Sequence, residues 1–440
     1  MIRIRNIRLS PMEDERMLKT KCEKKVGCEI LSYIIRKKSL DARRKGDVHF
    51  LYTIDVEVKN ESKILSSLHS TDVSASSHEE YEVPKSTPKE LSPIVVGFGP
   101  AGMFAALALA EAGLKPIVIE RGEDADSRDK TVKKFHQFGI LNEESNVQFG
   151  EGGAGTFSDG KLTTSVSDIR INYVLRRFVE AGAKKEILYD AKPHIGTDVL
   201  LKVVKEIRKK IIRLGGEVRF NSKLTDIETK GGRIHQIEIN HKEKIPCDNL
   251  ILALGHSARD TFKMLLSKGI PMERKPFAMG DRIEHSQDFI NASQYGKFAK
   301  YLPSADYKLI SHLPSGSSAH TFCMCPGGYV IASASENGGI VTNGASESKR
   351  DGCNANSAIL VPLTPSQFPH EGILGGALWQ REIEQACFKA VKTILHLARV
   401  HMILFVGKRP NHSALLSPRT DQGLRSKIST KFYLNALRTF

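Results

Sequence analysis

Hydrophobic and polar residues alternate at the start of the chain and again over residues 49–58, and a helical spacing lies between these segments. Alternation with a period of two predicts half-buried strands, so the three segments together predict a small α+β domain over residues 1–66. Residues 67–92 are rich in Ser, Glu, Thr, Pro and Lys and contain few large apolar side chains. This composition predicts an exposed, flexible linker and the first domain boundary.

The pattern changes to a βαβ unit after the linker. An apolar strand over residues 94–96 is followed by a glycine turn, by an Ala- and Leu-rich helix that stops at Gly113, and by a second strand over residues 116–119. A strand, a helix and a second strand within about thirty residues are typical of an α/β domain with a parallel sheet.

Further elements follow the βαβ unit. We expect Thr197 to be the N-cap of an amphipathic helix that ends at a Gly-Gly pair. Residues 249–254 are nearly all apolar, which predicts a parallel strand buried on both faces. Mixed strands and loops continue to about Trp379. Three short strands are predicted between these elements, over residues 217–220, 224–229 and 234–239.

The turn inside the βαβ unit carries a dinucleotide-binding motif, a GxGxxG placed directly between strand and helix. It consists of Gly97, Phe98, Gly99, Pro100, Ala101 and Gly102. Gly97 permits the tight turn, Gly99 lets the backbone approach a pyrophosphate, and Gly102 packs the helix on the strand. The helix N-terminus adds free N–H groups and a positive dipole. We therefore predict dinucleotide binding, against the alternative of an ordinary glycine-rich turn.

The residues that follow bear on which dinucleotide is bound. Glu120 closes the second strand and can accept hydrogen bonds from both hydroxyls of an adenosine ribose, which favours FAD or NAD over NADP. A second glycine-rich loop, GEGGAGTFSDGK, covers residues 150–161. An extended flavin dinucleotide needs more backbone around its pyrophosphate and ring, whereas a single NAD site does not, so the loop favours FAD. The alternative is a flexible surface loop.

These motifs resemble those of a flavoprotein family. GFGPAGMFAALALAEAG from Gly97, NVQFGEGGAGTFSDGKL from Asn146, LILALGHSARDTF from Leu250 and FCMCPGGYV from Phe322 are similar to segments of the NAD(FAD)-utilizing, FAD-dependent dehydrogenases. That family belongs to the glutathione-reductase-like class and is poorly characterised as to substrate. The resemblance includes the leading domain and reaches about residue 390.

The resemblance implies an α/β protein in which a Rossmann-like FAD-binding domain covers residues 93–258. An inserted mixed α+β substrate domain covers residues 259–380, and a basic, atypical tail covers residues 381–440. The implied activity is that of an FAD-dependent dehydrogenase, with hydride passing through flavin N5 between a substrate or NAD(P)H and an acceptor. By motif position, the residues implied to hold FAD are Gly97, Gly99, Pro100, Ala101, Gly102, Glu120, Arg121, Gly152, Gly153, Gly155, Thr156 and Gly255.

The end of the chain departs from the family. After about Lys389 the similarity fades into a basic segment, and a late glycine-rich segment that closes the flavin site in the family is not found. We interpret the tail as a reading-frame disruption or a degenerate end. The first alternative to an active enzyme is therefore a catalytically inactive FAD-binding remnant.

Four side chains are candidates for catalysis, each with a structural alternative. Cys323 and Cys325 are close enough in sequence to suggest redox chemistry, but a disulfide between them is expected to be strained, and a packed strand that runs into a Pro-Gly turn is favoured. His256 either donates to the flavin or a substrate anion or caps the next helix. Lys161 either offsets negative charge on a reduced flavin or is an ordinary solvated lysine. We find no constellation of metal ligands.

Charge and cysteine content bear on partners and compartment. The net charge is +15, with +6 over residues 1–60 and +8 over residues 381–440, so the middle of the chain is nearly neutral. A nucleic-acid partner that uses these basic ends is a distant second interpretation, because few aromatic residues accompany them. The seven cysteines are unevenly spaced, which favours reduced thiols and a cytoplasmic location. The longest apolar run is shorter than the ~20 residues of a membrane span, so no membrane partner is expected.

Overall fold

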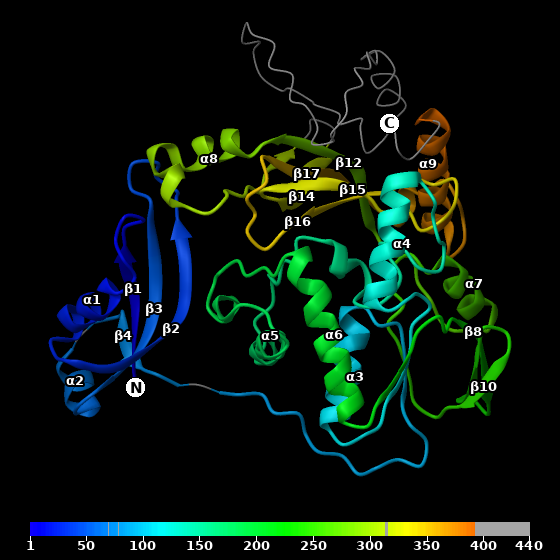
Figure 1. Cartoon of the computed structure of the whole chain (residues 1–440), viewed down its shortest axis with the longest axis horizontal. Helices are drawn as coiled ribbons and strands as arrows, with labels where there is room; N and C mark the ends of the chain where they lie inside the picture. The colour runs from blue at the N-terminus through cyan, green and yellow to red at the C-terminus, as the bar shows by residue number, and fades with distance from the viewer. Residues whose placement is uncertain (69, 78, 313–315, 392–440) are drawn as a thin grey trace, which may run out of the picture. The chain divides into compact units, whose positions relative to one another are not determined.

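The structure is a computed structural model that describes residues 1–391 except 69, 78 and 313–315 (Figure 1). An antiparallel sheet with strand order β2-β3-β1-β4 forms the N-terminal part. Helix α1 packs against it through Leu18, Cys22 and Val26, which are all buried. Its elements are β1 (Ile2–Leu9), α1 (Met17–Val26), β2 (Ile30–Asp41), β3 (His49–Val58), α2 (Glu61–Ser67) and β4 (Val73–Ala75).

Strand β4 lies within the predicted linker. It pairs with the edge of β1, and Val73 is buried in the N-terminal core. The N-terminal unit therefore extends about ten residues beyond the predicted boundary at residue 66, because a short strand with one buried valine is too weak a pattern to recognise in a Ser-rich segment.

A parallel sheet with strand order β11-β5-β6-β7 forms the centre of the next unit. Helices α3 and α6 share one hydrophobic core with its residues Val95 and Val118. This is the Rossmann-like arrangement that the βαβ pattern predicts. Its elements are β5 (Ile94–Val96), α3 (Pro100–Glu111), β6 (Ile117–Ile119), α4 (Ala125–Phe138), α5 (Arg170–Glu180), α6 (Thr197–Arg213), β7 (Glu217–Arg219) and β11 (Leu250–Leu252).

Two local predictions in this unit are wrong. Strand β11 is not buried on both faces, since Ile251 and Leu252 are 37% and 39% exposed. Within the described part of the chain it is an edge strand that pairs only with β5. Thr197 is not the N-cap of α6. Gly196 holds that position, and the Thr197 hydroxyl instead donates to the Thr156 carbonyl at 2.8 Å.

A three-stranded antiparallel sheet, β10-β9-β8, follows β7. Helix α7 packs against it through Leu265. The predicted domain boundary between residues 258 and 259 therefore separates α7 from the core into which it packs. These elements are β8 (Leu224–Lys230), β9 (Arg233–Ile239), β10 (Glu243–Pro246) and α7 (Arg259–Ser267).

The region predicted as the substrate domain contains a sheet with strand order β12-β17-β14-β13 and a separate β15-β16 pair. Helix α9 extends through the predicted start of the tail at residue 381, and residues 392–440 of that tail lie outside the described residues. The elements are β12 (Phe277–Ser286), α8 (Gln287–Tyr295), β13 (Ile310–His312), β14 (Ser318–Cys325), β15 (Gly328–Ala332), β16 (Thr342–Ser346), β17 (Asn354–Leu363) and α9 (Gly375–Val391).

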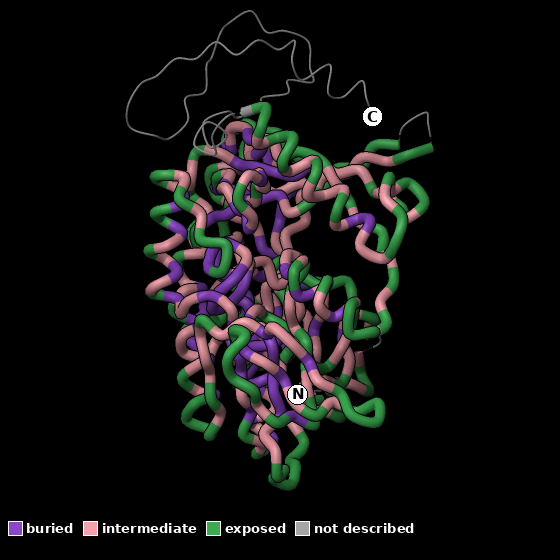
Figure 2. Tube along the Cα trace, turned by 90° about the vertical axis from the view of Figure 1, so that its right-hand side faces the viewer, coloured by how far each residue is buried: buried purple, intermediate pink, exposed green. Residues whose placement is uncertain are grey.

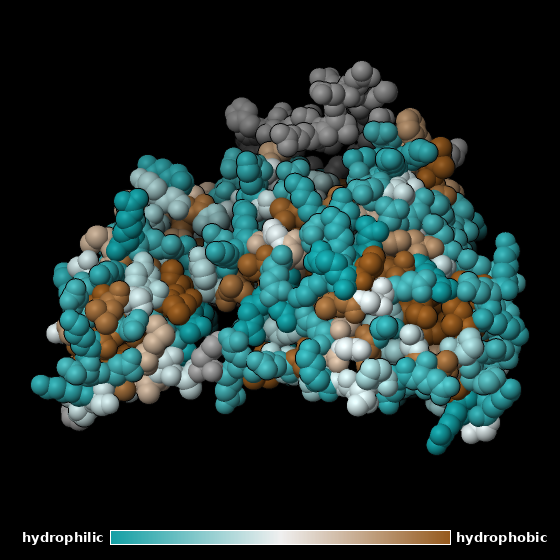
Figure 3. All heavy atoms as spheres, turned by 60° about the horizontal axis from the view of Figure 1, so that its bottom comes forward, coloured by the Kyte–Doolittle hydropathy of each residue, from teal (hydrophilic) through white to brown (hydrophobic). Residues whose placement is uncertain are grey.

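In Figure 2 buried residues lie mainly in the interior of the trace, whereas exposed residues lie mainly at its periphery. On the face shown in Figure 3, hydrophobic residues form separate patches among hydrophilic ones. Among the residues that the structure describes, no helix has both the length and the apolar character needed to cross a membrane.

Candidate functional site

A cavity of about 320 Å³ lies at the carboxyl ends of the parallel strands β5, β6 and β11. Ligands in open α/β sheets bind at this edge, in pockets of about 300–1,000 Å³. Three of the predicted cofactor residues, Gly102, Gly152 and Thr156, do not line the cavity. The other nine do: Gly97, Gly99, Pro100, Ala101, Glu120, Arg121, Gly153, Gly155 and Gly255.

The turn between β5 and α3 presents backbone to this cavity. Gly97 has a φ of 96°, and a side chain there would meet the Ala253 carbonyl. A side chain on Gly102 would meet the Gly97 carbonyl, so this glycine allows the helix to pack on the turn. Helix α3 begins with Pro100 and has no side-chain cap. The first amides of the helix therefore have no side-chain partner at the end that borders the cavity, where an anionic ligand such as a pyrophosphate can bind.

Glu120 connects three loops at the cavity. Its buried carboxylate accepts from the amide of Phe98 at 2.7 Å through Oε2, and from the amides of Gly122 and Gly150 at 2.9 Å through Oε1. Because a carboxylate has about four acceptor positions, one remains, on Oε2. In this arrangement Glu120 can therefore accept from one ribose hydroxyl, and not from both as the sequence suggested.

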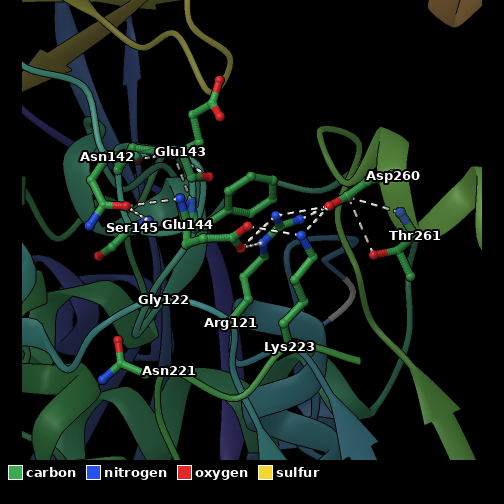
Figure 4. A network of polar contacts seen from close by, with 12 residues as sticks. Arg121, Gly122, Asn142, Glu143, Glu144, Ser145, Asn221, Lys223, Asp260 and Thr261 are labelled. Atoms are coloured by element: carbon green, nitrogen blue, oxygen red, sulfur yellow. Dashed lines mark hydrogen bonds and ion pairs between the residues drawn. The ribbon is translucent and has the colours of Figure 1, made fainter. Parts of the chain in front are cut away.

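Arg121 belongs to a compact network of two cations and two anions at the cavity wall (Figure 4). Arg121 lies 2.6 Å from Glu144 and 3.0 Å from Asp260, and Lys223 lies 2.8 Å and 2.6 Å from the same two carboxylates. The Arg121 guanidinium also lies over the Phe149 ring, 4.1 Å from its centroid. Each of its three guanidinium nitrogens already donates to a carboxylate, so Arg121 helps to shape the wall and its charge is paired before any ligand binds.

The charge network is expected to respond to acid. Burial alone would raise the pKa of Asp260, but hydrogen bonds and ion pairs with Arg121 and Lys223 outweigh burial and lower that pKa. A carboxyl with a lowered folded-state pKa stabilises the fold above its unfolded value of about 4, and this stabilisation is lost as the pH falls through the folded-state value.

We therefore expect Asp260→Asn to reduce the free energy of unfolding by about 1 kcal/mol at pH 7, since the Asp260 side chain is 45% exposed and solvent screens its pairs. The difference from the wild type should shrink below pH ~4 and in 1 M salt. Urea titrations of both proteins at pH 7 and pH 3 measure this difference in the free energy of unfolding. A difference that grows as the pH falls would contradict the conclusion that the pKa of Asp260 is lowered in the folded protein.

The second glycine-rich loop docks onto the first. The Gly152 amide donates to the Phe98 carbonyl at 2.8 Å, and a side chain on Gly153 would lie 2.9 Å from the Gly99 Cα atom. Thr156 is buried and its hydroxyl donates to the Glu151 carbonyl at 3.0 Å, so its side chain supports the loop and is not directed into the cavity. The two segments that the sequence assigned to one cofactor therefore meet.

Arg128, on α4, holds the second loop in shape and was not predicted. Its side chain is fully buried and donates to the carbonyls of Asn146, Glu151, Val147 and Gly153 at 2.6–3.0 Å. Burial lowers the pKa of Arg128 to about 10, which leaves the group charged at neutral pH. Arg128 lies on the buried face of α4 together with Ala125, Val132 and Phe135, and an arginine at a position of this apolar face is the signal by which the sequence could have identified it.

His256 lies four residues after the end of β11 and lines the cavity. The Ser257 hydroxyl lies 2.9 Å from its Nδ1 atom. Desolvation and the nearby positive charge of Arg259 lower the pKa of His256 below its ordinary value, so the ring is neutral at pH 7. His256 is therefore the predicted catalytic candidate that shares the cavity with the predicted cofactor residues.

Lys161, Cys323 and Cys325 do not line the cavity, but the structure brings them together elsewhere. The Lys161 Nζ atom lies 3.7 Å from Cys325 Sγ and 3.4 Å from Asp159. Strand β14 runs through the two cysteines into a Pro-Gly turn, as the sequence predicts. It is not a regular strand, however, because its pairing with β17 shifts by one residue between Phe322 and Cys325.

Comparisons with known proteins agree with a flavin site. A model described as pyridine nucleotide-disulphide oxidoreductase matches residues 92–291, and a model described as FAD-dependent protein, C-terminal domain-like, matches residues 276–436. A domain of unknown function matches residues 1–57. An uncharacterized protein of Clostridium beijerinckii is 49% identical over 398 residues, which are 88% of this chain and 74% of that protein.

The chain belongs to a family of FAD-binding oxidoreductases. The C-terminal match of this family reaches residue 436, beyond the point near residue 390 at which the resemblance was expected to fade. The disruption of the tail remains a prediction. Membership of the glutathione-reductase-like class within this family is also a prediction.

Three solved structures show a distant likeness to this chain. FqzB is 12% identical, with a TM-score of 0.33, over 69% of this chain and 60% of that chain. The tetracycline destructase Tet(51) is 13% identical, with a TM-score of 0.31, over 70% and 66%. The flavin-dependent brominase Bmp2 is 14% identical, with a TM-score of 0.32, over 69% and 63%. The chain spans less than two thirds of each of them, and at these scores no argument about chemistry rests on the likeness.

Proposed function

We propose that the chain binds one FAD in the cavity at the end of the parallel sheet and is a dehydrogenase that exchanges hydride with NAD(P)H or an oxidisable substrate. The observation that carries the proposal is the meeting of the Gly97–Gly102 turn, the Gly150–Gly155 loop and Glu120 around one cavity. FAD, when bound, supplies two-electron hydride chemistry at its N5 atom. The protein supplies binding, orientation and proton placement.

The residues fit the adenosine diphosphate half of FAD. The uncapped first turn of α3, with Gly99 and Ala101 at the cavity, would bind the pyrophosphate. The remaining acceptor position of Glu120 Oε2 would take one ribose hydroxyl. Side chains on Gly97 or Gly102 would collide with the backbone, so the turn keeps the shape in which its amides face the ligand.

The same geometry favours a nucleotide without a 2′-phosphate. Glu120, Glu144 and Asp260 place three carboxylates around this part of the site, and the cations Arg121 and Lys223 are already paired with two of them. A phosphate would have to displace these ion pairs and would lie near Glu120. This argument disfavours NADP as the resident dinucleotide. The backbone that the second glycine-rich loop adds to the cavity favours FAD over NAD, so we infer FAD in this cavity and NAD(P)H only as a transient donor.

His256 is the side chain that can hold or move a proton at this site. The neutral imidazole can accept a proton from a bound ligand, and the imidazolium formed in this way can return it; Ser257 is its hydrogen-bond partner at Nδ1. The sheet formed by β12, β17, β14 and β13 is the proposed substrate-binding part.

Anaerobic reduction tests the proposed activity. After loading with FAD and removal of free cofactor, the chain is mixed with NADH or with NADPH, and absorbance near ~450 nm is followed. We expect one of the two donors to bleach the band at least about tenfold faster than it bleaches free FAD. His256→Asn keeps a planar polar side chain but removes the group that can hold a proton, so its comparison with the wild type tests the role of His256 in proton transfer. A loaded protein that is reduced neither by these donors nor by a panel of oxidisable substrates would favour the alternative of an inactive FAD-binding remnant.

A further inference from the structure

One face of the sheet formed by β12, β17 and β14 carries an arginine and an exposed aromatic ring in the same row. Arg282 pairs with Ala358, and Ala358 pairs with Phe322 on its other side. Directly paired residues of antiparallel strands share a face and neighbouring strands are about 4.8 Å apart, so Arg282 and Phe322 stand about 10 Å apart on one side of the sheet. Ala358 between them is small and buried, whereas Phe322 is 59% exposed.

This face is covered at one end and open at the other. At the covered end Asn356 is completely buried, and a side chain on Gly344 of β16 would meet both the Asn356 amide and the Arg282 guanidinium. At the open end Ile310, in the row next to that of Arg282, is 58% exposed. Arg282 therefore lies at the border between the two ends.

Arg282 is held in place through one of its three nitrogens. Its Nη1 atom donates to Asn356 Oδ1 at 2.6 Å and to the Cys323 carbonyl at 3.3 Å. Among the residues that the structure describes, none pairs with Nε or Nη2, and since neither atom counts among the buried polar atoms that lack a partner, both are accessible. Arg350 differs, because its Nε and Nη2 atoms both donate to Asp159. Arg282 thus presents the edge of a guanidinium that binds both oxygens of a carboxylate.

Charge at this place also favours an anion. Lys161 and Arg350 both pair with Asp159, and Arg282 adds a cation that forms no ion pair with a described carboxylate. The buried Glu284 lies two residues beyond Arg282, at the covered end of the face. An anion that approaches from the open end therefore meets Arg282 first.

The covered end of the face adjoins the second glycine-rich loop. Lys161, at the end of that loop, lies 3.7 Å from Cys325 Sγ through its Nζ atom. A side chain on Gly344 would lie 2.9 Å from Cys325 Sγ and closer still to Arg282 Nη1, so these two groups are neighbours. Gly155 of the same loop lines the cavity proposed for FAD, and the chain from Gly155 to Lys161 spans at most about 20 Å. A ligand held by Arg282 therefore lies beside the loop that leads to the proposed flavin site.

We propose that this face binds the oxidisable substrate and that the substrate is a carboxylic acid with an apolar body, an inference that rests on the proposed function. The free edge of Arg282 binds the two carboxylate oxygens. The apolar body lies over Ala358 and against the exposed ring of Phe322. An anion without an apolar body would contact only the arginine, and an uncharged apolar molecule would leave the arginine without a partner.

Ligand-observed NMR titration of the full-length chain without flavin tests the proposal, with 3-phenylpropanoate as the probe. We expect its dissociation constant to be at least about tenfold lower than that of acetate, which lacks the ring, and that of 3-phenylpropanamide, which lacks the charge. Inorganic phosphate that binds more tightly than 3-phenylpropanoate would overturn the assignment to a carboxylate. Because the titration needs no flavin, it can fail while the chain still retains FAD, and FAD retention can fail while the probe still binds.

Variants of the row separate binding from folding, with melting temperatures to show which of them fold. Arg282→Gln should weaken binding of the probe at least about tenfold, and Arg282→Lys, which keeps the charge but not the fork, should restore only part of it. Asn356→Asp keeps the side-chain shape and gives Arg282 an internal carboxylate, so it should also weaken binding. Phe322→Ser, at an exposed position, should weaken binding of 3-phenylpropanoate and not of acetate.

Arg44→Gln is the matched control, because it removes an exposed arginine from another part of the chain. It should leave the affinity for the probe unchanged. A folded Arg282→Gln, Asn356→Asp or Phe322→Ser variant that binds 3-phenylpropanoate as tightly as the wild type would overturn the proposal.

Discussion

Gly99→Val is expected to weaken FAD binding by a factor on the order of 100 or more while the fold remains intact, since each 1.4 kcal/mol is a factor of ten. Gly99 lines the cavity at the start of α3, with a φ of −72° that valine can adopt. A Cβ atom at Gly99 would have its nearest protein contact 3.7 Å away, at Gly153. A Cβ atom therefore has room in the protein, and the methyl groups of valine are expected to occupy the space through which a pyrophosphate approaches the helix.

FAD retention after gel filtration, and the melting temperature of the same samples, measure this prediction. Gly46→Val is the matched control, because a side chain at Gly46 has no neighbour within 4 Å and the residue is far from the cavity in sequence. Normal retention in Gly99→Val would refute the assignment of the turn. A large loss of melting temperature would show instead that the position is structural.

Arg128→Met should lower the free energy of unfolding by about 3–5 kcal/mol, because four buried carbonyls lose a charged donor. FAD retention should fall with it, since two of these carbonyls, on Glu151 and Gly153, belong to the loop that docks on Gly99. Arg128→Lys keeps the charge but not the planar fork of donors, and we expect it to recover only part of the stability.

Urea titration of the apo protein measures the effect of Arg128→Met on stability directly. Lys133→Met on the same helix is the control, because its side chain is 67% exposed and its pair with Asp129 is a surface pair worth at most about 1 kcal/mol. Equal stabilities of Arg128→Met and Lys133→Met would contradict the role given to Arg128.

Local pattern predicts the parts of the fold in which sequence neighbours are also neighbours in space. The βαβ unit is found as predicted, because the period changes from strand to helix within one continuous segment and Gly97 and Gly113 mark its turns. The assignment of both glycine segments to one cavity also follows from the sequence, since each carries backbone that must approach a ligand.

Long-range contacts explain what the sequence does not show. The carboxylate of Asp260 meets Arg121 from 139 residues away, and Lys161 meets Cys325 from 164 residues away. The bulge at Cys323 is invisible in a pattern that fits a regular strand, because it depends on the register with β17. The exposure of β11 similarly depends on which strand, if any, lies beside it.

The central claim is that this chain holds FAD at the end of its parallel sheet. An absorbance spectrum of the purified full-length chain, recorded before and after incubation with FAD and removal of free cofactor, tests it most directly. The account predicts bands near ~375 and ~450 nm that remain with the protein and are released on denaturation. A chain that stays colourless after incubation with FAD would contradict the account.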